Sequence, residues 1–269
     1  MAVPANKLSS LELRIATALV LGGAALAALI LLPDSGWAVL VLCIVAAGAW
    51  EWSALIRLSR PLRVAYTLVT PLLCAVSMQF IPADAWAFVG LFWLVVAPVW
   101  LYRGWPMPSG TGGLLPGWLV LVPTGLAAIE LRQIDWTLPL AAIVLAVIAD
   151  SSAYFSGRRF GRHKLAPVIS PGKTWEGAAG ALAGVSIYAL AVATGFENCP
   201  LACLGKLLLA AWILLAVSIV GDLFESHAKR QAGVKDSGQI LPGHGGVLDR
   251  IDSLTAVLPT AMLLWIWLK

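Results

Sequence analysis

The chain has 269 residues, of which 60% are hydrophobic and only 12% are charged, and its mean hydropathy is +0.88. This composition excludes a soluble globular domain and predicts a bundle of membrane-spanning helices of about 20 residues each. The formal net charge of +4 is no indication of nucleic-acid binding, because basic residues of membrane proteins gather in cytoplasmic loops.

The apolar segments predict an all-α, polytopic integral membrane protein with about nine transmembrane helices. They lie at about residues 15–33, 37–50, 64–81, 86–102, 114–131, 138–155, 178–196, 207–224 and 254–268. Residues 1–137 would form an N-terminal group of transmembrane helices. Residues 138–269 would form a C-terminal catalytic region with two polar cytoplasmic loops, 156–177 and 221–253.

The distribution of basic residues predicts a cytoplasmic N-terminus. With this orientation, the only outward-facing members of the 18 lysines and arginines are Arg132, Lys206 and Lys269, as the positive-inside rule requires. Both polar loops then lie on the cytoplasmic side, where nucleotides are found. Cys199 and Cys203 share one outward-facing loop, and whether they form a disulfide is left open at this point.

The segment 221–253 is the longest polar stretch in the chain. Four of its side chains follow the spacing i, i+3, i+4, i+7 and would share one face of a helix: Asp222, Glu225, Ser226 and Lys229. Asp222 lies within an apolar run, where a charge is costly unless it is paired or binds a metal ion. A simple interfacial salt bridge between Lys229 and either acid is the alternative.

Asp249 and Asp252 lie three positions apart, just before the last predicted helix. Helix capping is one explanation for Asp252. Asp249 follows His244, Gly245 and Gly246, and paired glycines let the backbone approach a ligand and expose N–H groups to anions. Carboxylates from two helix ends, with a glycine turn between them, are suited to Mg²⁺ with bound phosphate.

Four cations are interleaved with these acids and glycines: Lys229, Arg230, Lys235 and Arg250. Cations placed on phosphate oxygens stabilise the transition state of phosphoryl transfer. Membrane topology and attraction to anionic lipid headgroups would explain some of these residues. They would not explain the interleaving with carboxylates and glycines.

The loop 156–177 supplies a second set of candidates. Asp150 lies near the end of the helix before it, and a basic cluster suited to an anionic headgroup follows at Arg158, Arg159, Arg162 and Lys164. Further on, Ser170, Lys173 and Thr174 resemble the end of a P-loop, but the first glycine and a preceding strand are missing. Lys173 and Thr174 are still candidates for phosphate contacts.

Two long motifs closely resemble the signature of the phosphatidate cytidylyltransferases, the CDP-diacylglycerol synthases. The first runs from Ser226 to Asp252 and ends in LPGHGGVLDRID, and the second joins Asp150 to residues 170–177, SPGKTWEG. One position departs from the family pattern. Ala228 stands where the family usually has a bulky apolar residue, which admits a paralogue with a shifted lipid preference.

The resemblance implies transfer of CMP from CTP to phosphatidic acid, which yields CDP-diacylglycerol and pyrophosphate. It also implies a bacterial inner-membrane location, an active site that faces the cytoplasm, and Mg²⁺, with a second cation admitted, on Asp222, Asp249 and Asp252. Catalytic roles would fall to Lys229, Arg230, Lys235, Asp236, His244 and Arg250. Substrate contacts would come from Asp150, Arg158, Arg159, Arg162, Lys164, Ser170, Lys173, Thr174, Ser226, Gly245 and Gly246.

Two other functions stay open at this point. One is a CTP-dependent enzyme that acts on another lipid phosphate or on a lipid alcohol. The less favoured one is an anion transporter, which would place ionisable groups near the bilayer midplane and often show repeated halves, whereas the charges here gather at one membrane face. The expected partners are CTP, phosphatidic acid and membrane lipids, and a homodimer is compatible with such a chain.

Overall fold

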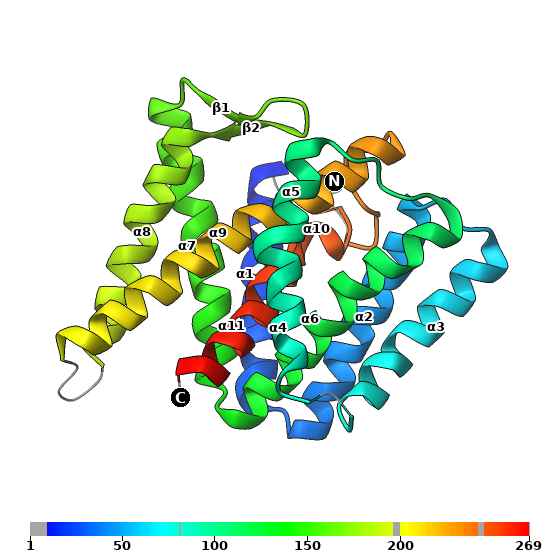
Figure 1. Ribbon diagram of the computed structural model, residues 1–269, viewed down its shortest axis with the longest axis horizontal. Helices are drawn as coiled ribbons and strands as arrows, with labels where there is room; N and C mark the ends of the chain where they lie inside the picture. The colour runs from blue at the N-terminus through cyan, green and yellow to red at the C-terminus, as the bar shows by residue number, and fades with distance from the viewer. Residues whose placement is uncertain (1–9, 81, 196–199, 242–244, 269) are drawn as a thin grey trace, which may run out of the picture.

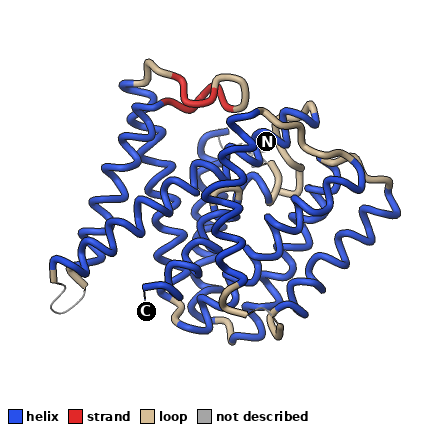
Figure 2. Tube along the Cα trace, viewed as in Figure 1, coloured by secondary structure: helices blue, strands red, loops and turns tan. Residues whose placement is uncertain are grey.

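The computed structural model describes residues 10–80, 82–195, 200–241 and 245–268, and these residues form a helical bundle (Figures 1 and 2). Its long helices are α1 (Ser10–Leu31), α2 (Asp34–Leu55), α3 (Arg60–Ser77), α6 (Leu114–Ile134), α7 (Thr137–Phe160), α8 (Trp175–Ala193), α9 (Leu201–Ala232) and α11 (Leu254–Leu268). A further helix runs from residue 85 to 103 as α4 (Ala85–Leu91), the π-helical turn η1 (Phe92–Val96) and α5 (Ala97–Arg103). The short helices are η2 (Gly110–Gly113) and α10 (Leu248–Ile251).

Six of the described helical segments are long and apolar enough to cross a membrane: α2, residues 85–103, residues 110–134, α7, α8 and α9. They support the predicted class, a mostly helical membrane protein. The predicted count of about nine would also need α1, α3 and α11. The apolar part of α11 is shorter, and the first turn of α3 carries Arg60 and Arg63. The count of nine and the orientation of the N-terminus therefore stay predictions.

A β-hairpin departs from the all-α prediction. The strand β1 (Lys164–Ala166) pairs antiparallel with β2 (Ser170–Thr174), and both are red in Figure 2. The strands are short and contain no alternation of apolar and polar residues, the pattern that identifies strands in a sequence. β2 leads directly into α8, whose first turn is capped by Thr174, because its Oγ1 accepts a hydrogen bond from the Gly177 N–H at 3.1 Å.

Three helices extend further than the apolar pattern predicted. α2 continues through Glu51 to Leu55, α7 to Phe160 and α9 to Ala232. Residues 225–232, which follow the predicted apolar helix at 207–224, are thus the last turns of α9. The helix ends at Gly233, which has a φ of 79°, a conformation that glycine adopts without strain. Hydropathy detects the part of a helix that meets lipid, whereas the backbone hydrogen bonds continue beyond it.

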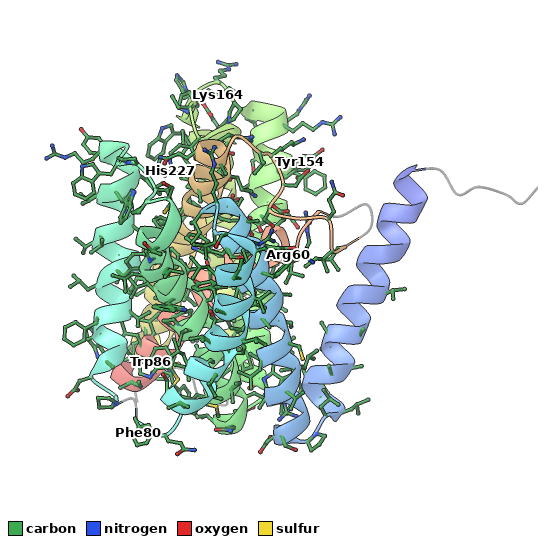
Figure 3. The ribbon with its side chains drawn as sticks, turned by 90° about the vertical axis from the view of Figure 1, so that its right-hand side faces the viewer. Arg60, Phe80, Trp86, Tyr154, Lys164 and His227 are labelled. Atoms are coloured by element: carbon green, nitrogen blue, oxygen red, sulfur yellow. The ribbon has the colours of Figure 1, made fainter. Side chains whose placement is uncertain are left out.

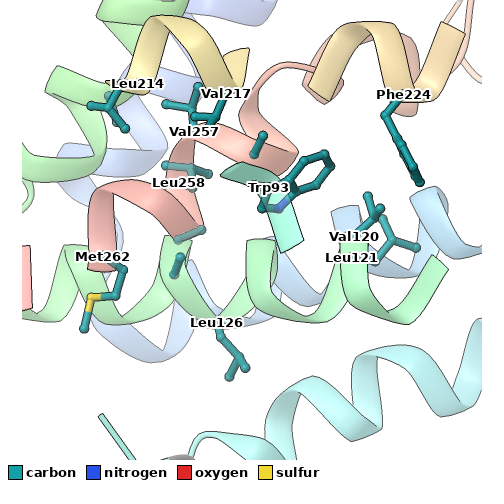
Figure 4. Close-up of a cluster of buried hydrophobic side chains, with 14 of the residues drawn as sticks. Trp93, Val120, Leu121, Leu126, Leu214, Val217, Phe224, Val257, Leu258 and Met262 are labelled. Carbon is teal, nitrogen blue, oxygen red and sulfur yellow. The ribbon is translucent and has the colours of Figure 1, made fainter. Parts of the chain in front are cut away.

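An aromatic cluster holds α9 in the centre of the bundle. Trp93, on η1, is fully buried at 0% exposure, and its ring centroid lies 5.8 Å from that of Phe224 on α9. Phe92 and Trp100 pack against the same ring at 5.7 and 5.9 Å. Figure 4 shows Trp93 and Phe224 among the buried side chains. Because Phe224 follows Asp222 by two positions, this packing fixes the part of α9 that carries the candidate site.

The N-terminal helices are tied to α9 by residues 104–113, which form the loop after α5 and the short helix η2. Trp52, on α2, donates from Nε1 to the Gly113 carbonyl at 3.0 Å. His227, on α9, donates from Nε2 to the Trp105 carbonyl at 2.9 Å. Contacts therefore run across residue 137, and the division of the chain at that residue stays a prediction.

Candidate functional site

The two polar segments of the sequence meet at one end of the bundle. Figure 3 shows Lys164, Tyr154 and His227 towards this end and Phe80 and Trp86 towards the other. A pocket of about 350 Å³ lies between α7, β2, α8 and α9. Its polar lining includes Asp150, Tyr154, Ser170, Lys173, Thr174, Ser218 and Asp222. The structure thus brings together predicted residues that are up to 72 positions apart, from Asp150 to Asp222.

Asp222 joins the two segments. Its Oδ2 lies 2.7 Å from Lys173 Nζ, which comes from β2, and its Oδ1 accepts a hydrogen bond from Ser226 Oγ at 3.2 Å. Both partners of the ion pair are about a quarter exposed, at 23% and 24%, so solvent and ligands can reach them. The sequence predicted a phosphate contact for Lys173, but it did not predict this pairing.

A second, more buried set of charges lies around Lys229. Its Nζ lies 2.6 Å from Asp249 Oδ1 and 3.3 Å from Glu225 Oε2. The predicted helical face is confirmed, since residues 222, 225, 226 and 229 all lie on α9 and interact along it. The alternative of a salt bridge between Lys229 and Glu225 is also confirmed, but Asp249 is a further partner at a shorter distance.

The turn before α10 is built around Asp249 Oδ2. This oxygen accepts hydrogen bonds from the Gly246 N–H at 2.8 Å, from the Ser237 N–H at 2.9 Å and from Ser237 Oγ at 3.0 Å. Burial works against the charged form of Asp249, but the hydrogen bonds from Lys229, Gly246 and Ser237 outweigh it and lower its pKa. Asp249 is therefore a fixed anion in this site.

The two predicted glycines serve this turn. Gly245 has a φ of 80°, and a Cβ there would lie 2.8 Å from Asp249 Oδ2. A Cβ on Gly246 would lie 2.2 Å from Ser237 Oγ. The sequence predicted that the backbone approaches a ligand at these two glycines. In the structure, the side chains of Asp249 and Ser237 lie against them instead. His244, a predicted catalytic residue, lies outside the described residues.

Asp150 and Asp252 add negative charge next to Asp222. Asp150 is exposed and lines the pocket. The pKa of Asp252 is raised to about 7. Burial is the largest cause, and the negative charges of Asp222 and Asp150 add to it. Asp252 Oδ1 also accepts a hydrogen bond from the Ser253 N–H at 2.8 Å, directly before α11. A helix cap would accept from an N–H two or three positions further on, so the capping explanation stays a prediction. The carboxylates of Asp150, Asp222 and Asp252 share one electrostatic environment.

Asp222 and Asp249 are each paired with a lysine. Among the side chains that the structure describes, no group of three or more His, Cys, Asp or Glu is arranged to hold a metal ion. The pairs Lys173–Asp222 and Lys229–Asp249 occupy oxygen atoms that a cation would need. The predicted metal ligands Asp222, Asp249 and Asp252 therefore stay a prediction, and a bound metal ion would share these carboxylates with the lysines or displace them.

The remaining predicted cations lie outside the lining of the pocket. Arg158 Nη1 donates to Tyr154 Oη at 3.0 Å, and Arg158 belongs to α7 rather than to the predicted loop. Arg230 Nε donates to the Ile169 carbonyl in the hairpin turn at 3.3 Å, so it connects α9 to the first polar segment. The other predicted residues at this surface are exposed: Arg159, Arg162, Lys164, Lys235, Asp236 and Arg250.

Glu51 is a residue of this site that the sequence analysis missed. It is 2% exposed, and it accepts hydrogen bonds from Ser237 Oγ and from the N–H groups of Val247 and Leu248. The apolar pattern of the sequence ends at this acid. A carboxylate that directly follows an apolar run, between two tryptophans, was the signal available in the sequence.

Gly221 sets the distance between α9 and the turn before α11. A Cβ on Gly221 would lie 2.9 Å from the Asp252 carbonyl oxygen and 3.0 Å from the Ala256 Cβ. We expect Gly221→Ala to lower kcat by about tenfold, because even a shift well under 1 Å displaces Asp222 relative to Asp252. The matched control is Gly205→Ala on the same helix, where a Cβ meets nothing within 4 Å. Equal kcat values for the two variants would contradict this reasoning.

Comparison with known proteins shows similarity along the whole chain. Residues 12–267 match the cytidylyltransferase family. A phosphatidate cytidylyltransferase of Pseudomonas aeruginosa is 44% identical over 268 residues, which cover 95% of this chain and 97% of the relative. One of Haemophilus influenzae is 35% identical over 281 residues, with 93% and 96% covered. One of Staphylococcus saprophyticus is 44% identical over 134 residues, with 47% and 48% covered.

Proposed function

The chain belongs to the cytidylyltransferase family, and from this premise we propose that it is a phosphatidate cytidylyltransferase of phospholipid biosynthesis. It transfers CMP from CTP to phosphatidic acid and releases pyrophosphate. One structural observation carries the proposal: Lys173 and Asp222, from two distant polar segments, meet at 2.7 Å in a pocket at one end of an apolar bundle. A lipid phosphate and a nucleotide would have to meet at such a membrane edge.

In the reaction, an oxygen of the lipid phosphate attacks the α-phosphorus of CTP. A new phosphorus–oxygen bond forms, and the bond to the β-phosphate oxygen breaks, so that pyrophosphate leaves. Both substrates are polyanions, and their repulsion must be offset by cations that are already in place. Lys173 and Lys229 hold such charges next to Asp222 and Asp249. Exposed cations at the rim, such as Lys235 and Arg250, would receive the leaving pyrophosphate.

A divalent cation would offset the negative charge of the acidic residues. Burial raises the pKa of Asp252, and the nearby negative charges of Asp222 and Asp150 raise it further. A cation would relieve the repulsion among these three carboxylates. Carboxylate oxygens are the ligands that Mg²⁺ prefers. Asp222, Asp249 and Asp252 would hold the ion, and a second cation is compatible with the number of carboxylates. Bound Mg²⁺ would supply charge neutralisation for the transferred phosphate.

The basic cluster of Arg158, Arg159, Arg162 and Lys164 is proposed to receive the lipid headgroup. Replacing all four by glutamine should raise the KM for phosphatidic acid by roughly tenfold and leave the KM for CTP nearly unchanged. The measurement is steady-state kinetics in mixed micelles with each substrate varied in turn. Arg103→Gln, an exposed cation at the end of α5, is the control. An effect on the KM for CTP alone would assign this cluster to the nucleotide.

We propose a bacterial inner-membrane location with the pocket facing the cytoplasm. The charge distribution supports a cytoplasmic N-terminus, about nine spans and an outward-facing Lys269. Reporter fusions should place Lys164 and Lys235 in the cytoplasm and the loop at residue 197 outside. Cys203, next to that loop, is disulfide-bonded, as an extracytoplasmic position allows. A fusion that places Lys235 outside would overturn the assignment of the nucleotide site.

The decisive experiment is incubation of the purified protein in detergent with CTP, Mg²⁺ and phosphatidic acid. CDP-diacylglycerol and pyrophosphate are the expected products. A CTP-dependent kinase would instead convert a lipid alcohol to its phosphate and release CDP, and preference for another lipid phosphate would appear in competition. Neither product, together with flux of an anion into proteoliposomes, would indicate a transporter. The mass of the detergent-solubilised protein tests separately whether the chain forms a homodimer.

A further inference from the structure

A carboxylate from the N-terminal part of the chain holds the turn that carries Asp249. Glu51, on α2, is 2% exposed. The Val247 N–H donates to its Oε1 at 2.9 Å, and the Leu248 N–H donates to its Oε2 at 2.8 Å. Ser237 Oγ donates to Oε2 at 3.0 Å. One side chain of α2 thus contacts both described parts of the segment that joins α9 to Asp249, which are residues 235–241 and 245–249.

Two glycines allow the segment to close over this carboxylate. A Cβ on Gly238 would lie 2.4 Å from Glu51 Oε1, and a Cβ on Gly246 would lie 2.5 Å from Glu51 Oε2. Both distances are too short for non-bonded carbon and oxygen atoms. A larger residue at either position would have to displace Glu51 or the backbone. The fit between α2 and this segment is therefore steric as well as polar.

The contacts continue from Glu51 into the charged site. Ser237 Oγ lies 3.0 Å from Glu51 Oε2 and also 3.0 Å from Asp249 Oδ2. Asp249 Oδ1 accepts a hydrogen bond from Lys229 Nζ at 2.6 Å. The single hydroxyl proton of Ser237 serves one carboxylate at a time, but the Ser237 N–H also donates to Asp249 Oδ2 at 2.9 Å. The hydroxyl on Glu51 and the N–H on Asp249 thus connect α2, through Ser237, to the buried lysine of α9.

We propose that Glu51 is a positioning residue for CMP transfer, which orders residues 235–241 and 245–249 so that Asp249 and Lys229 keep their places relative to the substrate phosphates. The inference rests on the proposed function. It adds Glu51, a residue of the N-terminal helices, to the residues on which CMP transfer depends. Glu51 does not line the pocket and acts through Ser237 and Asp249. An apolar side chain would fill the same space but would leave the Val247 and Leu248 N–H groups without an acceptor.

The geometry requires a carboxylate rather than an amide. Both oxygens of Glu51 accept hydrogen bonds, and every group facing them is a donor. In Glu51→Gln, one oxygen becomes an NH₂ group, which is only a donor. Whichever way the amide is turned, its NH₂ group faces at least one N–H of the turn. This variant therefore disturbs the segment with almost no change of volume.

The test uses the full-length protein in detergent. We expect Glu51→Gln to lower kcat, per folded molecule, by about tenfold to a hundredfold, while the KM values for CTP and phosphatidic acid change little. Ser237→Ala should lower kcat in the same way, and the double variant should be no worse than the poorer single variant, because both changes break one series of contacts. The matched control is Glu130→Gln, a half-buried acid on α6.

A purely structural role would give a different result. Glu51→Gln would then lower the unfolding temperature but leave kcat per folded molecule unchanged, and this outcome would overturn the proposal. If Glu51→Gln does not fold, Ser237→Ala decides, because it interrupts the same contacts in the segment itself. Additive effects of the two substitutions would also contradict the inference.

A readout without catalysis separates this inference from the proposed function. Lys235 is exposed within the segment, so trypsin can report how well the segment is ordered. Cleavage after Lys235 should be several-fold faster in Glu51→Gln than in the wild type or in Glu130→Gln. If the wild type makes no CDP-diacylglycerol, the proposed function fails, while faster cleavage would still show that Glu51 orders the segment. Equal cleavage rates in all three proteins would refute the ordering itself.

Discussion

Asp222→Asn and Asp249→Asn should each lower kcat by about a hundredfold or more, with the protein still folded. Asparagine keeps the shape of the side chain but removes one negative charge, and loss of a main electrostatic element of a site commonly has an effect of this size. Asp222 is the carboxylate that joins both polar segments through Lys173. Asp249 organises the turn before α10 through Gly246 and Ser237. The measurement is the initial rate at saturating substrates over a range of Mg²⁺ concentrations.

The comparison variants make this result specific. Asp252→Asn should have a smaller effect, because the hydrogen bond of Asp252 comes from the adjacent Ser253 N–H, and an asparagine oxygen still accepts it. Asp135→Asn, an exposed acid between α6 and α7, should behave as the wild type. If both main variants keep near-normal turnover at limiting Mg²⁺, the metal assignment is wrong. Asp150 and Asp236 are then the next pair to test.

Lys229→Met should abolish activity and also destabilise the protein by about 3 kcal/mol. Only 10% of the Lys229 side chain is exposed, and its partners Glu225 and Asp249 are 6% and 5% exposed. Removal of the cation leaves two buried carboxylates without their counter-charge, and breaking a buried ion pair from one side typically has a cost of this order. Thermal unfolding in detergent and the CTP-dependent rate are the two measurements.

A second substitution separates stability from activity in this variant. Glu225→Gln in the Lys229→Met background removes one of the two unpaired charges and should recover part of the stability, but no activity. Lys206→Met, an exposed lysine on the same helix, is the control and should change neither quantity. An unchanged unfolding temperature for Lys229→Met would show that the buried charges do not depend on Lys229.

The sequence by itself determined the class of the protein and the local part of the site. Hydropathy alone predicts a membrane protein, because roughly 20 apolar residues in a row have few other stable environments in a cell. The helical face with Asp222, Ser226 and Lys229 was predictable for a related reason: residues three and four apart on a helix are always neighbours. The two motifs are long enough to indicate the family, which the similarity along residues 12–267 then confirmed.

Only the tertiary structure decided which charges are partners. The pairs Lys173–Asp222 and Lys229–Asp249 link residues that are far apart along the chain, and no local spacing specifies such pairs. Glu51 was missed for the same reason. It ends an apolar run in the sequence, yet the packing of α2 brings it to Ser237, 186 positions away. Hydropathy reports where a helix meets lipid, whereas the position of a buried carboxylate depends on the donors that other elements bring to it.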